Sequence, residues 1–191
     1  MSRPQPPKPA KLVIGLFTKH KALFEPVVTN LSERFGEIDT ISRWFSFSYT
    51  DYYEKEMGAP LFRRMISFKR LIPQEALAAI KLSTNEIEAV YGQDGKRQIN
   101  IDPGYLLLER FVLATGKNYT HRIFIGSGIY ADLTLIYSKG DFRTLPWTYP
   151  DYASQDIMGF LTNVRKKYNI DLKNEGELKV ESGEIVGHEV Y

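Results

Sequence analysis

LFRRMISFKRLI, residues 61–72, is the stretch that decides the fold. Its apolar and polar residues alternate, which predicts a strand whose neighbouring side chains point to opposite faces of a sheet. The alternation places Arg64 on the face that carries Phe62 and Phe68, whereas Arg63 points the other way. A guanidinium among apolar side chains needs a counter-charge, so we expect Arg64 to meet a carboxylate or a bound anion.

The segments around this strand predict an α+β domain. In chain order, the expected elements are a strand over 11–17, a helix over 23–35, a strand over 38–49, the strand over 61–72, a helical segment over 73–91 and a strand that ends before Asp102. That order is the order of a ferredoxin-like βαββαβ unit, here extended by a β-hairpin and a C-terminal helix, although order alone also fits other α+β topologies. A capping pattern at Ser83 leaves open whether 73–91 is one helix or two.

The second half of the chain predicts a turn and then the hairpin. The string DPGY, residues 102–105, places Pro and Gly at the central positions of a type II turn. The hairpin is predicted over residues 121–136, around the string GSG. A three-residue loop is favoured there because it puts the apolar side chains and His121 on one face and pairs Arg122 with Asp132.

The two ends of the chain are expected to lie outside the domain. Residues 1–10 contain four prolines, which predicts an extended and disordered leader. A single α+β domain is predicted over residues 11–168, and its last helix begins near Ser154. Residues 169–191 are charged and weakly periodic, which predicts a tail or an added hairpin.

The composition excludes several classes of site and partner. The absence of cysteine excludes disulfides, thiolate metal sites and cysteine nucleophiles. The chain has 25 Lys and Arg against 23 Asp and Glu, and a net charge of +2 counts against a nucleic-acid partner. No apolar run reaches the roughly 18 residues that cross a bilayer, and the first residues lack the apolar core of a signal peptide. We therefore expect no membrane partner and a cytoplasmic location.

Familiar catalytic motifs are absent from the sequence. The phosphate-binding pattern GxxxxGK[ST] fails because Gly116-Lys117 is followed by Asn118. The GSG string lacks the third glycine of a dinucleotide fingerprint and lies between two strands. The patterns GxSxG and HExxH and the EF-hand loop do not occur either. The sequence therefore assigns no reaction, no cofactor and no metal, and it leaves open whether the protein is an enzyme.

Seven polar residues remain as candidates for a ligand-binding site. They are Arg64, Asp102, His121, Arg122, Asp132, Tyr149 and Asp151. Structural alternatives exist for most of them: Asp102 can brace its turn, His121 can be a half-buried core residue, and Asp151 can cap the final helix. Arg122 and Asp132 either form an ion pair across the hairpin or line a pocket, and Tyr149 is either a core aromatic or a site residue.

Six strings together resemble a known family. They are TDYYEKEMG, LFRRMISFKRLI, INIDPGYL, VLATGKN, HRIFIGSGIYADLTL and PWTYPDY. In these strings the chain is similar to the prokaryotic family catalogued as domain of unknown function 4416, and the likeness covers residues 9–168. The resemblance implies no established activity and assigns no site residue.

A site for a small anionic ligand is the function that these residues favour. Arg64 and Arg122 would hold an anionic group such as phosphate, because planar guanidinium groups suit bidentate contacts to anions. Asp102, His121, Asp132 and Asp151 would be available for proton transfer or for binding a metal. The loop at 49–60 would cover the site as a lid. Two alternatives stay open: a nucleic-acid module with exposed aromatics on a ferredoxin-like sheet, and a homo-oligomeric interaction protein with an aromatic interface.

Overall fold

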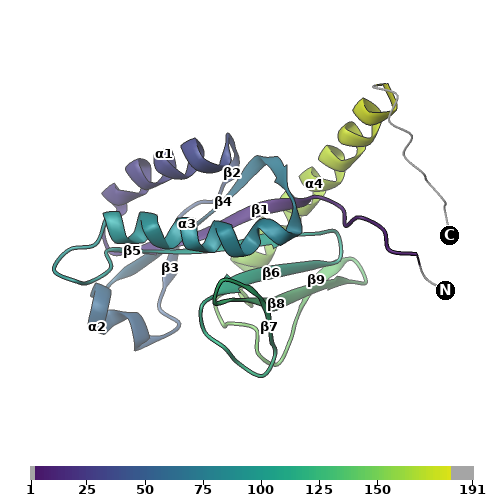
Figure 1. Ribbon diagram of the computed structural model, residues 1–191. Helices are drawn as coiled ribbons and strands as arrows, with labels where there is room; N and C mark the ends of the chain where they lie inside the picture. Colours follow the sequence, from purple (N-terminus) through teal and green to yellow (C-terminus); the bar gives the residue numbers. More distant parts are fainter. Residues whose placement is uncertain (1–2, 182–191) are drawn as a thin grey trace.

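One antiparallel sheet of nine strands organises the part of the chain that the computed structural model describes, residues 3–181 (Figure 1). The strands are β1 (Ala10–Thr18), β2 (Ile38–Ile41), β3 (Phe45–Phe47), β4 (Leu61–Ile72), β5 (Ile99–Leu106), β6 (Arg110–Thr115), β7 (Arg122–Gly126), β8 (Ile129–Ser138) and β9 (Asp141–Thr144). Their order across the sheet is β2-β4-β1-β5-β6-β8-β7, with β3 beside β4 and β9 beside β8. The fold is a mixed α+β fold, as the sequence predicts.

Helices cover both faces of this sheet. They are α1 (Phe24–Phe35), α2 (Glu54–Met57), α3 (Leu77–Val90) and α4 (Gln155–Glu181), with short 3-10 turns at Lys21–Leu23, Asp51–Tyr53 and Gln74–Ala76. Helices α1 and α3 lie side by side (Figure 1). Arg64 of β4 lies over the ring of Phe24 in α1, whereas its neighbour Arg63 contacts Tyr152, just ahead of α4. Successive strand residues point to opposite faces, so α1 and α4 cover opposite faces.

Strand β1 is the centre of the core. All nine of its residues are buried, and it pairs with β4 on one side and with β5 on the other. A continuous apolar run suits a strand that is covered on both faces, because polar alternation is needed only where one face meets water. The main hydrophobic cluster gathers side chains from β4, β5, β6, α1 and α4 around it.

Three predicted elements can be compared directly with the structure. Strand β4 has the bounds that its alternation predicts. The predicted strand over 38–49 is divided, because β2 ends at Ile41 and β3 begins at Phe45, and both pair with β4. Helix α3 continues through Ser83, so the segment after β4 contains one α-helix and not two.

The predicted turn at residues 102–105 is wrong, because these residues lie inside β5. Pro103 pairs with Ile14 of β1, and Gly104 pairs with Val13. Proline lacks a backbone donor, so within a sheet it is found where one side of a strand has no partner. That condition holds at Pro103 because β6 pairs with β5 only from Gly104 onwards.

The hairpin of β7 and β8 pairs Arg122 with Asp132, as the sequence predicts, but its loop is shorter. Gly126 pairs with Ile129, so only two residues form the turn, and a bulge before Gly126 absorbs the extra residue. The two turn residues have φ values of 52° and 75°. Positive φ at both positions is the geometry of a type I′ turn, whose twist matches that of the flanking strands.

Helix α4 is longer than the sequence predicts. It continues to Glu181, so residues 169–181 are helical where a charged tail or an added hairpin is predicted. The extension is tied to β1 by the buried Lys11, whose Nζ lies 2.6 Å from Asp171, and this long-range contact leaves no periodic signal. Residues 3–9 of the predicted leader have neither helix nor strand, and residues 1–2 and 182–191 lie outside the described part. Across residues 3–181, no helix has the length and apolar character to span a membrane.

Candidate functional site

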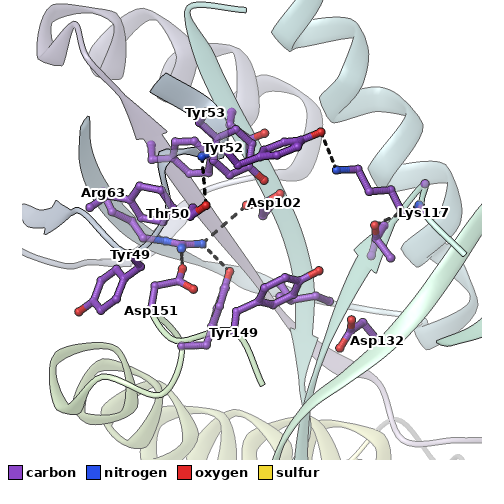
Figure 2. A pocket seen from close by; sticks show the side chains of 18 of the residues that line it. Tyr49, Thr50, Tyr52, Tyr53, Arg63, Asp102, Lys117, Asp132, Tyr149 and Asp151 are labelled. Atoms are coloured by element: carbon purple, nitrogen blue, oxygen red, sulfur yellow. Dashed lines mark hydrogen bonds and ion pairs between the residues drawn. The ribbon is translucent and has the colours of Figure 1, made fainter. Parts of the chain in front are cut away.

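A cleft opens in the sheet where β5 and β6 separate (Figure 2). The two strands are joined at Gly104, Tyr105 and Leu106 of β5, and the pairing stops there. The approach is close just before the separation, because a Cβ on Gly104 would lie 2.5 Å from the carbonyl oxygen of Val112. Beyond it, Pro103 offers no donor to β6, and the strands diverge around a cavity of about 750 Å³.

Where β5 no longer pairs with β6, two charged side chains of α3 bind the backbone of β5. Lys81 Nζ donates a hydrogen bond to the carbonyl oxygen of Ile101 at 2.8 Å, and the backbone N–H of Ile101 donates to Glu88 Oε1 at 2.6 Å. Buried backbone groups must find partners, so the side chains of α3 replace the missing strand. Burial raises the pKa of Glu88 to about 7, against the opposing effects of Lys81 and the Ile101 N–H.

Arg63 is the buried cation at the base of the cleft. It forms an ion pair with Asp151, and its Nη2 donates a hydrogen bond to Tyr152 Oη at 2.8 Å and lies 3.7 Å from Asp102 Oδ2 (Figure 2). Its Nε is buried without a hydrogen-bond partner in the described structure. Gly15 makes room for this group, because a Cβ there would lie 2.8 Å from Nη2.

Arg97 ties the segment ahead of β5 to α2. Its Nε and Nη2 donate to both carboxylate oxygens of Glu56, at 2.8 and 2.7 Å, and its Nη1 donates to Asn100 Oδ1 at 2.8 Å. The guanidinium lowers the pKa of Glu56, and Glu56 raises the pKa of Arg97. Asn100 is buried in the cleft wall, and its Nδ2 has no hydrogen-bond partner among the described groups.

Two exposed loops meet at the mouth of the cleft. Lys117, which follows β6, donates from Nζ to Tyr52 Oη at 3.1 Å and lies 4.4 Å from the centre of that ring (Figure 2). The hydrogen bond from Lys117 lowers the pKa of Tyr52. Tyr52 belongs to the loop at 49–60, which the sequence predicts to cover the site, and residues of this loop line the cleft.

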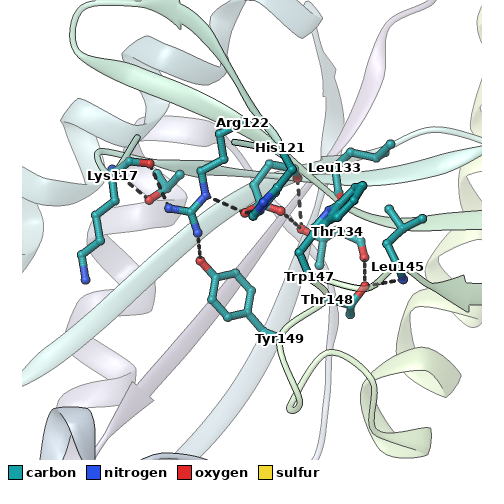
Figure 3. A network of polar contacts seen from close by, with 11 residues as sticks. Lys117, His121, Arg122, Leu133, Thr134, Leu145, Trp147, Thr148 and Tyr149 are labelled. Atoms are coloured by element: carbon teal, nitrogen blue, oxygen red, sulfur yellow. Dashed lines mark hydrogen bonds and ion pairs between the residues drawn. The ribbon is translucent and has the colours of Figure 1, made fainter. Parts of the chain in front are cut away.

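A polar network that includes His121, Arg122 and Tyr149 lies beside the cleft (Figure 3). Asp132 of β8 is its centre. Its Oδ2 lies 2.9 Å from Arg122 Nε and 3.2 Å from His121 Nε2. Arg122 also donates to the Lys117 carbonyl oxygen at 2.9 Å and to Tyr149 Oη at 2.5 Å. Through one guanidinium, the hairpin therefore fixes the loop that carries Lys117 and the tyrosine that lines the opposite wall.

The structure brings six of the seven predicted site residues together. Asp102, Asp132, Tyr149 and Asp151 line the cleft, and His121 and Arg122 contact it through Asp132 and Tyr149. His121 does not lie on the apolar face of the hairpin as the alternation predicts. It precedes β7, outside the strand, where the two-residue period does not apply.

Arg64 is the exception, because it lies on the opposite face of the sheet. Its guanidinium packs over the rings of Phe24 at 4.5 Å and Trp44 at 5.1 Å, and its Nε donates to the Ser42 carbonyl oxygen at 2.9 Å. The expected carboxylate is replaced by two aromatic faces, whose quadrupoles stabilise a cation. The alternation is correct, but Arg63 is the arginine that points into the cleft.

Five charged residues of the cleft are absent from the prediction: Arg63, Lys81, Glu88, Arg97 and Lys117. A signal for two of them exists in the sequence. Lys81 and Glu88 follow Leu77 and Thr84 along one stripe of α3, and charged residues on a buried helical stripe need specific partners. For Arg63 and Arg97, the partners are distant in sequence and no local pattern indicates them.

The cleft combines hydrogen-bond donors, carboxylates and protonated phenols. Burial raises the pKa of Tyr149, and it raises the pKa of Tyr53 to about 12, so these hydroxyls stay protonated at neutral pH. Cationic and acidic side chains both line the walls. Among the residues whose side chains the structure describes, no cluster of three or more His, Asp or Glu is arranged to hold a metal ion. The arrangement suits a polar ligand that both donates and accepts hydrogen bonds.

Comparison with known proteins gives one match. A family model described as a domain of unknown function, DUF4416, matches residues 8–168. No curated protein and no solved structure matches the chain. The matched segment contains the whole cleft and the network around Asp132.

Proposed function

The chain belongs to the DUF4416 family, and we propose that it binds a small ligand with an anionic group, such as phosphate, in the cleft between β5 and β6. One observation carries the proposal: cationic side chains from four separate parts of the chain converge on this cavity. They are Arg63 of β4, Lys81 of α3, Arg97 ahead of β5 and Lys117 after β6. A cavity of about 750 Å³ is within the usual size of small-molecule sites.

Unused hydrogen-bonding capacity supports the proposal. Arg63 Nε and Asn100 Nδ2 are buried donors without partners among the described groups. A buried unpaired donor costs free energy, and both of these side chains belong to residues that line the cleft. Lys117 contacts Tyr52 but forms no ion pair with a described carboxylate, so its charge is available to an anion at the mouth.

The carboxylates of the cleft would lie beside such a ligand. Asp102 and Asp132 line the walls, and Asp151 lies at the base next to Arg63. These groups would be available for proton transfer to or from the bound molecule. Binding is the part of the proposal that the geometry supports, and a reaction would build on it.

We also infer that the first half of the fold is a ferredoxin-like unit. The elements β1, α1, β2, β4, α3 and β5 occur in the order βαββαβ, with β3 and α2 inserted between β2 and β4. Their strands lie side by side as β2-β4-β1-β5 with antiparallel pairing throughout. The later strands β6 to β9 would then extend this unit at β5, and the cleft would lie at the junction.

A thermal-shift screen tests the binding proposal. Inorganic phosphate, sugar phosphates and nucleotides would be compared with chloride at equal ionic strength. A ligand that binds only the native state raises the melting temperature, and one of these phosphates is expected to do so. Lys117→Gln should reduce the rise, whereas Lys166→Gln, an exposed lysine of α4, should not. Identical melting curves with every phosphate and with chloride would contradict the proposal.

A second candidate function is self-association through β7, favoured by one observation. Within the described chain β7 pairs only with β8, and it exposes 72% of Ile123 and 60% of Phe124. An open strand edge with exposed apolar side chains is suited to pairing with another copy of itself. Light scattering after size exclusion tests this: a dimer that Phe124→Lys converts to a monomer is the expected result, and a wild-type monomer at high concentration excludes it.

A further inference from the structure

Asp102 is a carboxylate without a hydrogen bond inside a cleft that gathers cations. It lies on β5, lines the cavity, and its side chain is 27% exposed. Arg63 Nη2 is 3.7 Å away and Lys81 Nζ is 4.0 Å away, and both distances are too long for hydrogen bonds. No described residue donates a hydrogen bond to this carboxylate, although both of its neighbours donate to other groups.

The position of Asp102 discriminates between kinds of ligand. A bare anion that approached Arg63 or Lys81 would also approach this carboxylate, and like charges at that distance repel. An ammonium group bound at Asp102 would lie close to the charges of Arg63 and Lys81, and their repulsion disfavours a cationic ligand as well. The group that suits this position is a neutral hydrogen-bond donor, because a carboxylate accepts strongly from a neutral hydroxyl.

We propose that Asp102 accepts a hydrogen bond from a hydroxyl group of the ligand, so that the cleft selects hydroxylated phosphate esters, of the sugar phosphate type, over bare phosphate and simple alkyl phosphates. This inference rests on the proposed function, since it names the class of ligand that the same cleft takes. The selectivity comes from this one carboxylate, which accepts a hydrogen bond from a hydroxyl on the carbon skeleton of the ligand.

Isothermal titration calorimetry with two probes tests the inference. Ribose 5-phosphate carries free hydroxyls, and ethyl phosphate carries the same charged group without them. The wild-type protein should bind ribose 5-phosphate at least about tenfold more tightly, which is the usual effect of one hydrogen bond to a charged group. Asp102→Asn should reduce this ratio to between about one and three by weakening the binding of ribose 5-phosphate, because a neutral amide oxygen accepts a hydrogen bond less strongly than a carboxylate does.

A matched variant controls for the loss of a charge. Asp94→Asn removes an exposed carboxylate from the turn between α3 and β5, where the positive φ of 51° suits asparagine equally well. It should keep the wild-type ratio. Unfolding curves of both variants check that the fold is retained. The ratio of the two affinities in the wild-type protein tests the inference even if a variant does not fold.

The outcomes separate this inference from the proposed function. If both probes bind the wild-type protein with equal affinity, or if Asp102→Asn keeps the wild-type ratio, the inference is overturned while phosphate binding stands. If neither probe binds and the phosphates of the thermal-shift screen also have no effect, the proposed function fails and the inference fails with it. A ratio of about ten that collapses in Asp102→Asn and persists in Asp94→Asn supports both.

Discussion

Glu88 of α3 accepts a hydrogen bond from the backbone N–H of Ile101 at 2.6 Å, so a helix side chain takes the place of a neighbouring strand. The same residue of β5 is bound at its carbonyl oxygen by Lys81. An opening in a sheet normally leaves backbone groups that need water, and here two charged side chains satisfy them from the covered face. The cleft is therefore stabilised by the helix behind it. Burial raises the pKa of Glu88, in the wall of the cleft, to about 7.

The first prediction concerns the pH dependence of stability. Burial raises the pKa of Glu88 from 4.5 to about 7, so between these values the folded state binds more protons than the unfolded state. Stability from this group is present at low pH and is lost as the pH rises towards 7, by up to about 3 kcal/mol. Urea unfolding of the wild type and Glu88→Gln from pH 5 to pH 8 measures it. The difference in the free energy of unfolding between the wild type and Glu88→Gln should change with pH. The difference between the wild type and Glu33→Gln, a substitution at an exposed position of α1, should stay constant.

The second prediction concerns space beside Arg63. Gly15→Ala places a Cβ 2.8 Å from Arg63 Nη2 and 3.0 Å from Tyr152 Oη, so the buried guanidinium must move. We expect a loss of about 1–3 kcal/mol in the free energy of unfolding, as for other overpacked cores. Gly159→Ala in α4 meets nothing within 4 Å and should stabilise the protein by about 0.5–1 kcal/mol. Thermal unfolding of the two variants should give shifts of opposite sign, and equal shifts would contradict the close packing at Gly15.

The third prediction concerns the buried ion pair of Arg63 and Asp151. Arg63→Met leaves the Asp151 carboxylate buried without its partner, which should cost about 3–5 kcal/mol. Arg63→Met combined with Asp151→Asn removes both charges and should recover part of that loss. A double-mutant cycle measured by urea unfolding gives the coupling free energy. Additive effects of the two substitutions would show that the charges do not stabilise each other.

The fourth prediction concerns Arg122 as a positioning residue. Its guanidinium binds Asp132, the Lys117 carbonyl oxygen and Tyr149 Oη in three directions, which a lysine cannot reproduce. Arg122→Lys should cost about 1–2 kcal/mol of stability. It should also weaken the binding of ribose 5-phosphate, because Tyr149 and the Lys117 loop lose their common anchor. Arg143→Lys on β9 is the control, since Arg143 is exposed; an affinity unchanged in both variants would remove Arg122 from the site.

Local periodicity is enough to predict most of the strands and helices. The alternation in residues 61–72 gives β4 its bounds, and the hairpin pattern gives the pairing of Arg122 with Asp132. Two of the failures, the turn at residues 102–105 and the end of α4, depend on contacts between distant segments. Pro103-Gly104 has the composition of a turn, and only the position of β6 shows why it lies in a strand.

Only part of the candidate site could be predicted, because the rest depends on contacts between residues that are distant in sequence. Alternation separates Arg63 from Arg64, but it cannot show which face of β4 receives the carboxylates. That depends on Asp102 from β5 and Asp151 from the segment ahead of α4, which reach Arg63 only in the folded chain. Lys81 and Glu88 carry a local signal, a pair of charges on a buried stripe of α3, and such residues are worth including in similar predictions.

Three residue pairs join β5 to β6 in the described chain: Gly104 with Leu113, Tyr105 with Val112 and Leu106 with Phe111. Each further pair would move the closed end of the opening by one residue, about 3.3 Å along the strands. Replacing Pro103 by a residue with a backbone donor would permit such a pair with Ala114. Lengthening or shortening this run of three pairs would therefore change the length of the opening, while the strands on either side of it keep their partners.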